Sequence, residues 1–511
     1  MGGGSKKASK SQQKAQSSSS DSKSTRLFSG WLSLRCLVIL GIAVLASVLN
    51  RYHMARMFES DRHFSHLADF EREMTFRTEM GLYFSYYKTL VEADSFLDGL
   101  HRITSDNVSE FGHTINTLKR FNLYPELVLS ALYRTYMRAA SVFGWRTQDC
   151  WQTNRGEGLE PIQSCEGMGN THYFYVNHSF ALAGTVAGAL FLLGVMLSDS
   201  LLGGLLTVGA FFFNHGECTR VQWTPPLRES FGYPIFLLEI LLVSFLLKTC
   251  GFSLCNPTRE LPLERHFRRP SRLWCFPVAF LTASFMMSWQ FAQFALSTQV
   301  GALFLCFLLG FVEAPILRVV TLGHLLGFLA GFVALFGNEM LLTSMFLSSL
   351  LMTMLCLQAD RWLKLDFRMA YLPVFAAGTV GVKVTIGRAL AVKDDAHIFD
   401  ILRSKFSDYS NFHTRLYTCA PEFDFLGGEV YWKLTLTALL PAAVGALLLF
   451  AAYLLKDELR SLWSASSAKA RPHTAVTLYN ALQLAAFTLM AVLIMRLKLF
   501  WTPQLCVLAS L

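Results

Sequence analysis

Apolar residues gather in long runs along most of the chain, and polar segments separate these runs. A run of about 20 apolar residues can cross the hydrocarbon core of a bilayer as a helix, so the pattern predicts an all-α polytopic membrane protein with about eleven spans. The runs lie near 32–49, 175–197, 201–213, 230–247, 273–291, 295–312, 319–336, 340–358, 369–390, 430–455 and 477–495. The run at 201–213 is short and also fits a re-entrant segment, and the break at 291–295 rests on polar residues that include Gln290 and Gln293.

Composition excludes an ordinary soluble enzyme. Hydrophobic residues make up 53% of the 511 residues and charged residues only 16%, whereas soluble domains average about 25% charged residues. Residues 1–30 are rich in Ser, Lys and Gln, which predicts a disordered tail. No convincing small-residue cleavage site follows the first apolar run, so residues 31–50 are predicted to remain as the first transmembrane helix.

The net charge of +9 is compatible with nucleic-acid binding, but the placement of the charges favours membrane topology instead. If the N-terminus is cytosolic, the segments 1–30, 248–272, 359–368 and 456–472 hold 19 Lys and Arg residues against 7 acids. The segments on the opposite side, 51–172 and 391–429, hold 17 against 23. This asymmetry follows the positive-inside rule. It predicts a cytosolic N-terminus and no nucleic-acid partner.

The charges and apolar runs together predict the organisation of the chain. A cytosolic tail (1–30) and a first transmembrane helix (31–50) precede a large lumenal loop (51–172). A transmembrane bundle (173–390), a second lumenal loop (391–429) and further transmembrane helices (430–511) follow.

Two signals in the first loop fit a lumenal location. Asn107-Val-Ser is an acceptor triplet for N-glycosylation. Cys150 and Cys165 lie 15 residues apart, and an oxidising lumen would permit a disulfide between them. Most of the other cysteines lie in or beside apolar runs, which predicts core packing rather than a metal cluster.

An acidic residue in the first loop is the candidate catalytic group. Residues 69–88 show helical spacing that predicts one helix on the membrane surface. Arg72, Phe76, Glu79, Tyr83 and Tyr86 would share one face of that helix. Glu79 then either pairs with an arginine on a solvated face or takes a proton as a partly desolvated acid with a raised pKa. The spacing leaves both interpretations open.

Basic residues at the ends of spans are candidates for binding an anion. Arg220 and Arg228 follow the third apolar run, and Arg496 and Lys498 follow the last complete run at its predicted lumenal end. Such residues are either interfacial anchors or a clamp for phosphate, whose oxygens match the guanidinium fork. The segment 394–400 contains Asp394, Asp395 and His397, but its spacing favours a helix N-cap over a metal site.

Six segments closely resemble the protein tryptophan C-mannosyltransferases, the dumpy-nineteen-like family. They are HFSHLADFEREMTFRTEMGLYFSYYKT (63–89), NTLKRFNLYPE (116–126), FNHGECTRVQWTPPLRESF (213–231), DDAHIFDILRSKF (394–406), LYTCAPEFDF (416–425) and IMRLKLFWTP (494–503). The resemblance extends from about residue 50 to the last residue, and its motifs are long and specific.

The resemblance implies an enzyme with a GT-C type transmembrane bundle in the endoplasmic reticulum membrane. Members of the family transfer mannose from dolichyl-phosphate-mannose to C2 of the indole in Trp-x-x-Trp motifs of secretory proteins, such as thrombospondin repeats and cytokine receptors. Glu79 lies in the matching FRTEMG motif, where the family places its catalytic carboxylate. Neither a metal nor a cofactor other than the donor substrate is expected.

This chemistry assigns a role to each candidate residue. Glu79 would remove the C2 proton after the indole attacks the anomeric carbon with inversion. Arg220, assisted by Arg228, Arg496 or Lys498, would stabilise the leaving phosphate. The aromatic residues Phe76, Tyr83 and Tyr86 would hold the acceptor indole.

Two departures from the family pattern are visible. Gln504 stands where the family usually has His, which affects the expected donor contacts. The chain ends at Leu511, whereas family members continue into a lumenal C-terminal domain, so this domain is expected to be absent. The alternatives are a truncated inactive form, a polytopic scaffold that needs no Glu79, and a transporter that uses Lys383 and Arg388 in the membrane.

Overall fold

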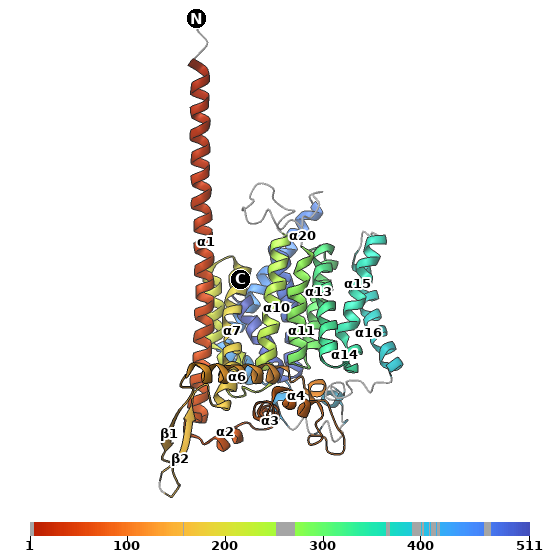
Figure 1. Ribbon diagram of the computed structural model, residues 1–511. Coiled ribbons are helices and arrows are strands. Elements are labelled where there is room, and N and C mark those ends of the chain that lie inside the picture. The colour runs from red at the N-terminus through yellow and green to blue at the C-terminus, as the bar shows by residue number, and fades with distance from the viewer. Residues whose placement is uncertain are drawn as a thin grey trace.

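The computed structural model describes residues 5–156, 158–251, 271–363, 368–390, 400, 403–407, 409, 415, 420–463 and 472–511. Over these residues the chain is helical apart from one two-stranded hairpin, and its long helices stand side by side in a bundle (Figure 1).

The elements of the first loop and the helices that follow it are α2 (Asp69–Thr75), α3 (Glu79–Glu92), α4 (Phe96–Thr104), α5 (Thr117–Phe121), α6 (Tyr124–Phe143), β1 (Asp149–Thr153), β2 (Ile162–Glu166), α7 (Thr171–Ser198), α8 (Leu201–Phe213), α9 (His215–Cys218) and α10 (Arg228–Gly251). The helices after these are α11 (Cys275–Ser288), α12 (Ala292–Leu308), α13 (Ala314–Ala334), α14 (Glu339–Leu342), α15 (Met345–Leu363), α16 (Tyr371–Leu390), α19 (Gly428–Leu436), α20 (Leu439–Trp463), α21 (Pro472–Leu493) and α22 (Lys498–Leu508).

The apolar runs form the helices that the sequence predicts, because a chain in lipid must satisfy its backbone hydrogen bonds internally. Among the described residues, 8 helices are long and apolar enough to cross a membrane, and three shorter apolar helices accompany them. The long ones are Leu34–Arg62, Thr171–Ser198, Arg228–Thr249, Ala314–Ala334, Glu339–Leu363, Arg368–Leu390, Leu439–Lys456 and Thr474–Leu493. The chain is therefore a multi-pass membrane protein. The break predicted at 291–295 lies slightly earlier, between the end of α11 at Ser288 and the start of α12 at Ala292.

The first helix extends past its predicted end at residue 50. Helix α1 has the bounds Ser5–Arg62, and the part that is long and apolar enough to cross a membrane is Leu34–Arg62. The disordered tail at residues 1–30 stays a prediction. Against α7, a Cβ on Gly188 would meet the Oγ of Ser47 at 2.3 Å, so glycine is what permits the close approach of these two helices.

The predicted run 430–455 is divided into two helices. Helix α19 ends at Leu436 and α20 begins at Leu439. Between them Ala438 has a φ of 58°, in the left-handed region that interrupts a right-handed helix. Apolar periodicity could not reveal this break because both halves are apolar.

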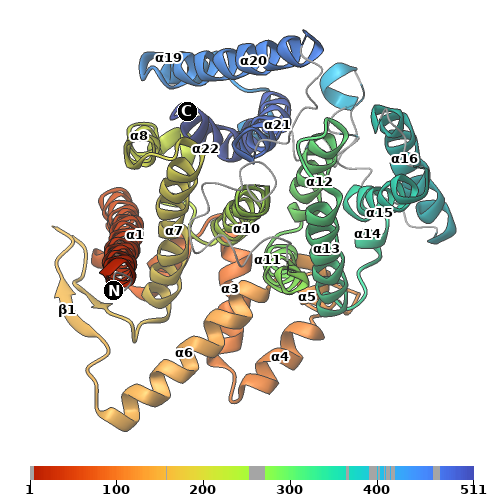
Figure 2. The ribbon, with the colours of Figure 1, turned by 90° about the horizontal axis from the view of Figure 1, so that it is seen from above.

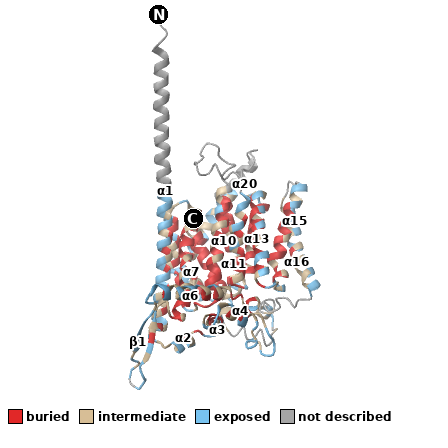
Figure 3. Cartoon of the chain, in the orientation of Figure 1, coloured by how far each residue is buried: buried red, intermediate tan, exposed pale blue. Residues whose placement is uncertain are grey.

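The first loop folds at one end of the bundle, which we call the loop end. Helices α2–α6 and the hairpin all lie there, and α6 lies across the ends of the upright helices (Figure 1). Seen from above, α3 and α6 lie beside α10 and α11, while α19 and α20 form a separate row on the far side (Figure 2). Buried residues concentrate in the central helices and continue into the loop end (Figure 3).

An aromatic core joins the loop end to the bundle. Its buried rings include Phe64, Phe84 and Tyr87 from the first loop and Tyr175 from α7, and each ring lies within 6 Å of another. Such aromatic pairs contribute about 0.5–1.5 kcal/mol each beyond the area that they bury. This core fixes α3, and therefore Glu79, against α7.

Candidate active site

Glu79 is the first residue of α3, and the predicted continuous helix over 69–88 is wrong. Helix α2 ends at Thr75, and Thr78 has a φ of 55°, so the backbone reverses before α3 begins at Glu79. A Cβ on Gly81 would lie 2.8 Å from the carbonyl oxygen of Phe76, so this tight reversal requires glycine there. Because of the break, Arg72 and Glu79 do not share a helix face.

The carboxylate of Glu79 faces an arginine from the C-terminal part of the chain. Its Oε2 lies 3.9 Å from Nη2 of Arg496, and its side chain is 50% exposed. Arg496 belongs to a short turn, Met495–Leu497, between α21 and α22. The structure therefore brings a half-exposed acid from the first loop next to a guanidinium that follows it by more than 400 residues.

Arg496 and Arg220 form an arginine pair held by a buried carboxylate. Nε and Nη2 of Arg496 donate to Oε2 of Glu229 at 3.1 and 2.9 Å, and Nε of Arg220 donates to Oε1 of the same residue. Glu229 is only 3% exposed. Its two oxygens therefore fix both guanidinium groups at the start of α10.

A second carboxylate, from Glu422, also contacts the arginine pair. Its Oε1 lies 2.6 Å from Nη1 of Arg220, and its Oε2 lies 3.9 Å from Nη1 of Arg496. Glu422 lies in a short turn, Pro421–Phe423, and is 40% exposed.

The electrostatics keep both guanidinium groups charged. Burial alone would lower the pKa of Arg496, but the carboxylates of Glu229, Glu79 and Glu422 outweigh burial and raise that pKa above its ordinary value. Burial likewise opposes charge on Arg220, and Glu229 and Glu422 reverse the effect and raise its pKa. Guanidinium groups in general match the geometry of carboxylate and phosphate oxygens, and here the pair contacts carboxylates.

The other two predicted basic residues bind different partners. Lys498 donates to Oε2 of Glu217 at 2.6 Å, and Lys433 donates to Oε1 of the same carboxylate at 3.3 Å. Burial would raise the pKa of Glu217, but its bonds to the two lysines lower it overall. Lys498 therefore forms an ion pair of its own beside the arginine pair.

Arg228 is buried in a second ion pair and does not join Arg220. It is 4% exposed, and its guanidinium binds both carboxylate oxygens of Glu126 on α6, one of them at 2.8 Å. It also lies 3.8 Å from the centroid of the Tyr83 ring. These contacts give Arg228 a structural place between α3, α6 and α10.

The three aromatic residues expected to hold the acceptor are packed in the protein. Phe76 is buried against Phe64 and Phe84, with ring centroids 6.1 and 4.8 Å away. Tyr86 donates to Asp106 at 2.8 Å, and Tyr83 lies under Arg228. Burial raises the pKa of Tyr83 to about 12, although Arg228 opposes this shift. Tyr83 is therefore a neutral phenol at neutral pH.

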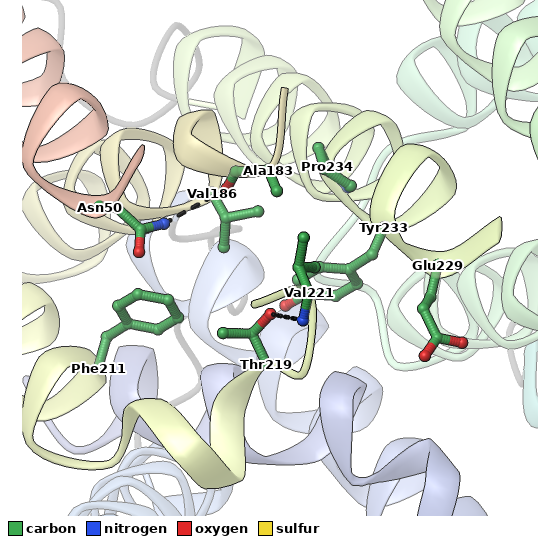
Figure 4. Close-up of a pocket in the computed structure, with 9 residues that line it drawn as sticks. All are labelled: Asn50, Ala183, Val186, Phe211, Thr219, Val221, Glu229, Tyr233 and Pro234. Atoms are coloured by element: carbon green, nitrogen blue, oxygen red, sulfur yellow. Dashed lines mark hydrogen bonds between the residues drawn. The ribbon is translucent and has the colours of Figure 1, made fainter. Parts of the chain in front are cut away.

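A small internal cavity lies beside the arginine pair. Figure 4 shows its lining residues, with Glu229 at one edge and Asn50 of α1 across from it. The others are Ala183, Val186, Phe211, Thr219, Val221, Tyr233 and Pro234. Its volume of about 20 Å³ suits a water molecule and is too small for an indole or a sugar.

The disulfide expected in the first loop is present. Cys150 and Cys165 are joined across β1 and β2, where they face each other in the antiparallel register. Arg72 anchors this hairpin, because its buried guanidinium donates to the Cys165 carbonyl and to the Ser164 hydroxyl, both at 2.7 Å. The sequence placed Arg72 beside Glu79, whereas its actual role is to fix the hairpin.

Asn107 is exposed in the first loop, just before a turn that begins at Val108, and Ser109 of its triplet shares a hydrogen bond with the Tyr86 hydroxyl at 2.6 Å. We expect the chain made in a secretory cell to carry a glycan there. Treatment with a peptide N-glycosidase should increase its gel mobility, and Asn107→Gln should abolish this shift. Asn177 begins a second acceptor triplet, Asn-His-Ser, but lies within α7 at the start of a span. Asn177→Gln is therefore the matched control and should leave the shift intact. A full-length chain insensitive to the enzyme would contradict a lumenal first loop.

The acidic partners in the site were not predicted from the sequence. Glu229 lies inside the segment 213–231, of which only the arginines were predicted to be functional, and Glu422 lies inside 416–425, to which no role was assigned. Glu126 is the last residue of the segment 116–126. A buried arginine needs a carboxylate partner, and this rule alone could have pointed to them.

Two further expectations concern metals and Gln504. Asp394, Asp395 and His397 lie outside the described residues, and within the described part no three His, Cys, Asp or Glu side chains gather as a metal site would require. Gln504 is 2% exposed and donates to Oδ1 of Asn480 at 2.9 Å. It therefore packs between α22 and α21 and is not one of the residues that contact the arginine pair.

The fold and the site define a class: a multi-pass helical membrane protein that places a half-exposed acid beside a pair of arginines at one end of its bundle. Comparison with known proteins gives the family. Residues 44–511 match the family Dpy19, described as Q-cell neuroblast polarisation. The chain is 45% identical over 498 residues to the C-mannosyltransferase dpy-19 of Caenorhabditis elegans. The aligned region covers 96% of this chain and 69% of that relative.

Two human relatives agree. Identity is 44% over 482 residues with the protein C-mannosyl-transferase DPY19L1 of Homo sapiens, covering 92% of this chain and 68% of that protein. It is 40% over 484 residues with the probable C-mannosyltransferase DPY19L2 of Homo sapiens, covering 92% and 61%. The chain therefore belongs to the Dpy19 family, in which the named relatives are glycosyltransferases that attach mannose through carbon. It spans between 61% and 69% of the length of these three relatives.

Proposed function

We propose that this chain is a GT-C type C-mannosyltransferase of the endoplasmic reticulum membrane, with its N-terminus in the cytosol. It transfers mannose from dolichyl-phosphate-mannose to C2 of the indole in Trp-x-x-Trp motifs of secretory proteins, such as thrombospondin repeats. The observation that carries the proposal is the approach of the Glu79 carboxylate to within 3.9 Å of Arg496, a member of the arginine pair.

The arginine pair supplies the donor site in this proposal. The phosphate group of the donor binds Arg220 and Arg496, whose charges are fixed before the donor arrives. Preorganised charge of this kind stabilises the negative charge that develops on a leaving group. Because the leaving phosphodiester becomes a phosphate monoester that carries one more negative charge, two guanidinium groups can stabilise it without a divalent cation.

Glu79 supplies the base. The indole C2 attacks the anomeric carbon of mannose, a carbon–carbon bond forms, and the bond from the anomeric carbon to phosphate oxygen breaks with its electron pair going to phosphate. Attack opposite the leaving group inverts the anomeric centre. The proton left on C2 passes to the Glu79 carboxylate, which restores the aromatic ring. The half-exposed position of Glu79 leaves its carboxylate accessible to an acceptor from outside the bundle.

The proposal is tested by expressing the chain in cells that lack their own tryptophan mannosyltransferase, together with a secreted reporter that contains one Trp-x-x-Trp motif. We expect the reporter to gain a hexose that stays on the tryptophan during fragmentation, because a carbon–carbon bond does not break as a glycosidic bond does. A reporter with Phe in place of the tryptophans is the control. An unmodified reporter, with the chain present in the membrane at normal amount, would refute the activity.

A further inference from the structure

The carboxylate of Glu422 reaches both members of the arginine pair. One of its oxygens lies 2.6 Å from Arg220 and the other 3.9 Å from Arg496. The two oxygens of one carboxylate thus each approach a different guanidinium group. The oxygens of a bound phosphate would contact the two arginines in the same way. Glu422 thus stands where an anionic ligand of the pair would bind.

The charges around the pair are already more than balanced without a ligand. Arg220 and Arg496 face the carboxylates of Glu229, Glu422 and Glu79. If a phosphate bound the arginine pair while all three carboxylates stayed in place, it would add one more negative charge at short range. Like charges at such distances repel strongly. One carboxylate therefore has to leave when a phosphate binds.

Burial and contacts together decide which carboxylate leaves. Glu79 is 50% exposed but contacts only Arg496, at 3.9 Å, so it does not occupy the position between the two arginines. Glu229 is 3% exposed and both of its oxygens are bonded, so breaking its contacts would strand a buried charge. Glu422 is 40% exposed, and an ion pair in contact with water contributes little because water solvates the released carboxylate. Glu229 is the fixed counter-ion, and Glu422 is the exchangeable one.

The backbone around Glu422 is held independently of its side chain. The amide of Met495 donates to the carbonyl of Asp424 at 2.9 Å, and the amide of Leu426 donates to the carbonyl of Val492 at 3.2 Å. These bonds tie the segment after Glu422 to the turn that carries Arg496. Rotation of the Glu422 side chain alone is therefore enough to expose the arginine pair.

We infer that Glu422 occupies the place of the donor phosphate in the empty protein and is displaced when a lipid-linked phosphate binds. The inference rests on the proposed function for the identity of the anion. It makes Glu422 a positioning residue that keeps the arginine pair aligned between turnovers and competes with the donor for it.

The test measures binding of dolichyl phosphate to the purified full chain in detergent, without an acceptor. Glu422→Gln should lower the dissociation constant by about threefold to fivefold, because the competing carboxylate is gone. Glu429→Gln, an exposed acid on α19, is the matched control for the change in net charge and should bind as the unaltered chain does. Arg496→Leu should bind at least tenfold more weakly.

Unchanged or weaker binding by Glu422→Gln would overturn the inference, because the carboxylate would then be a bystander or part of the ligand site. Equal tightening by Glu429→Gln would also overturn it and reduce the effect to net charge. The reporter assay separates the two proposals. If Glu422→Gln binds dolichyl phosphate more tightly but the unaltered chain transfers no mannose, the displacement of Glu422 stands and the proposed activity is refuted. If the unaltered chain transfers mannose but Glu422→Gln binds no more tightly, the activity stands and the displacement is refuted. Absence of binding by every variant would count against both.

Discussion

Tryptophan mannosylation is expected to fall by about 10²- to 10⁴-fold in Glu79→Gln, the range that a positioned base contributes to a reaction. The amide keeps the shape of the side chain but cannot accept the C2 proton. Folding should be unaffected, because the carboxylate is half exposed and its contact with Arg496, at 3.9 Å, is long. The measurement is the modified fraction of the reporter per amount of membrane-inserted chain.

A control on the same helix separates catalysis from charge. Glu92 lies at the other end of α3, is 61% exposed, and has an ion pair with Lys88 at 3.8 Å. Glu92→Gln should therefore transfer mannose at the rate of the unaltered chain. Full transfer by Glu79→Gln would remove this residue from the chemistry and favour a scaffold that needs no base at this position.

The transmembrane part of the fold could be predicted from the sequence because lipid leaves a chain few choices. Backbone groups without water must bond within their own helix, so each long apolar run marks a helix. The breaks are harder to predict. At Thr78 and Ala438 the chain adopts a positive φ that neither residue type favours, and packing around these positions imposes it. A periodic pattern continues through such a break, which is why 69–88 was predicted as one helix.

The site was predictable in part and for two different reasons. Arg496 was identified as a basic residue at the predicted lumenal end of a span, and the structure places it beside Glu79. Glu79 itself stood out by resemblance to a family motif, since spacing gave the wrong neighbours for it. Arg72, assigned to the same face, anchors the hairpin instead.

The partners of the arginines could not be predicted from local sequence. Glu229 is adjacent to Arg228, yet it binds Arg220 and Arg496 while Arg228 turns to Glu126. Such a choice depends on which helices meet at the loop end, and sequence spacing contains no information on that. For the same reason the contacts of Tyr83 with Arg228 and of Tyr86 with Asp106 could not be predicted from spacing.

The pair formed by Glu126 and Arg228 should be the most important ion pair for the stability of the loop end. Glu126 is fully buried, and it accepts bonds from Arg228 and, at 2.7 Å, from the Tyr175 hydroxyl. Glu126→Gln leaves the guanidinium without a counter-charge in a buried place. Removing one partner of such a pair costs about 3–5 kcal/mol. We expect a clear loss of thermal stability in detergent, measured as the temperature at which half of the monodisperse protein is lost.

A double variant tests whether Arg228 has any role beyond this pair. Glu126→Leu together with Arg228→Met replaces the ion pair by apolar side chains of similar size, which restores most of the stability when the site repacks. If Arg228 serves only to hold α3, α6 and α10 together, mannosylation should return along with stability. Stability that returns while transfer stays at the level of the single variant would instead show that Arg228 contacts the donor, as its position beside Arg220 in the sequence had suggested. Glu126→Gln as stable as the unaltered chain would mean that the buried pair does not hold the loop end together.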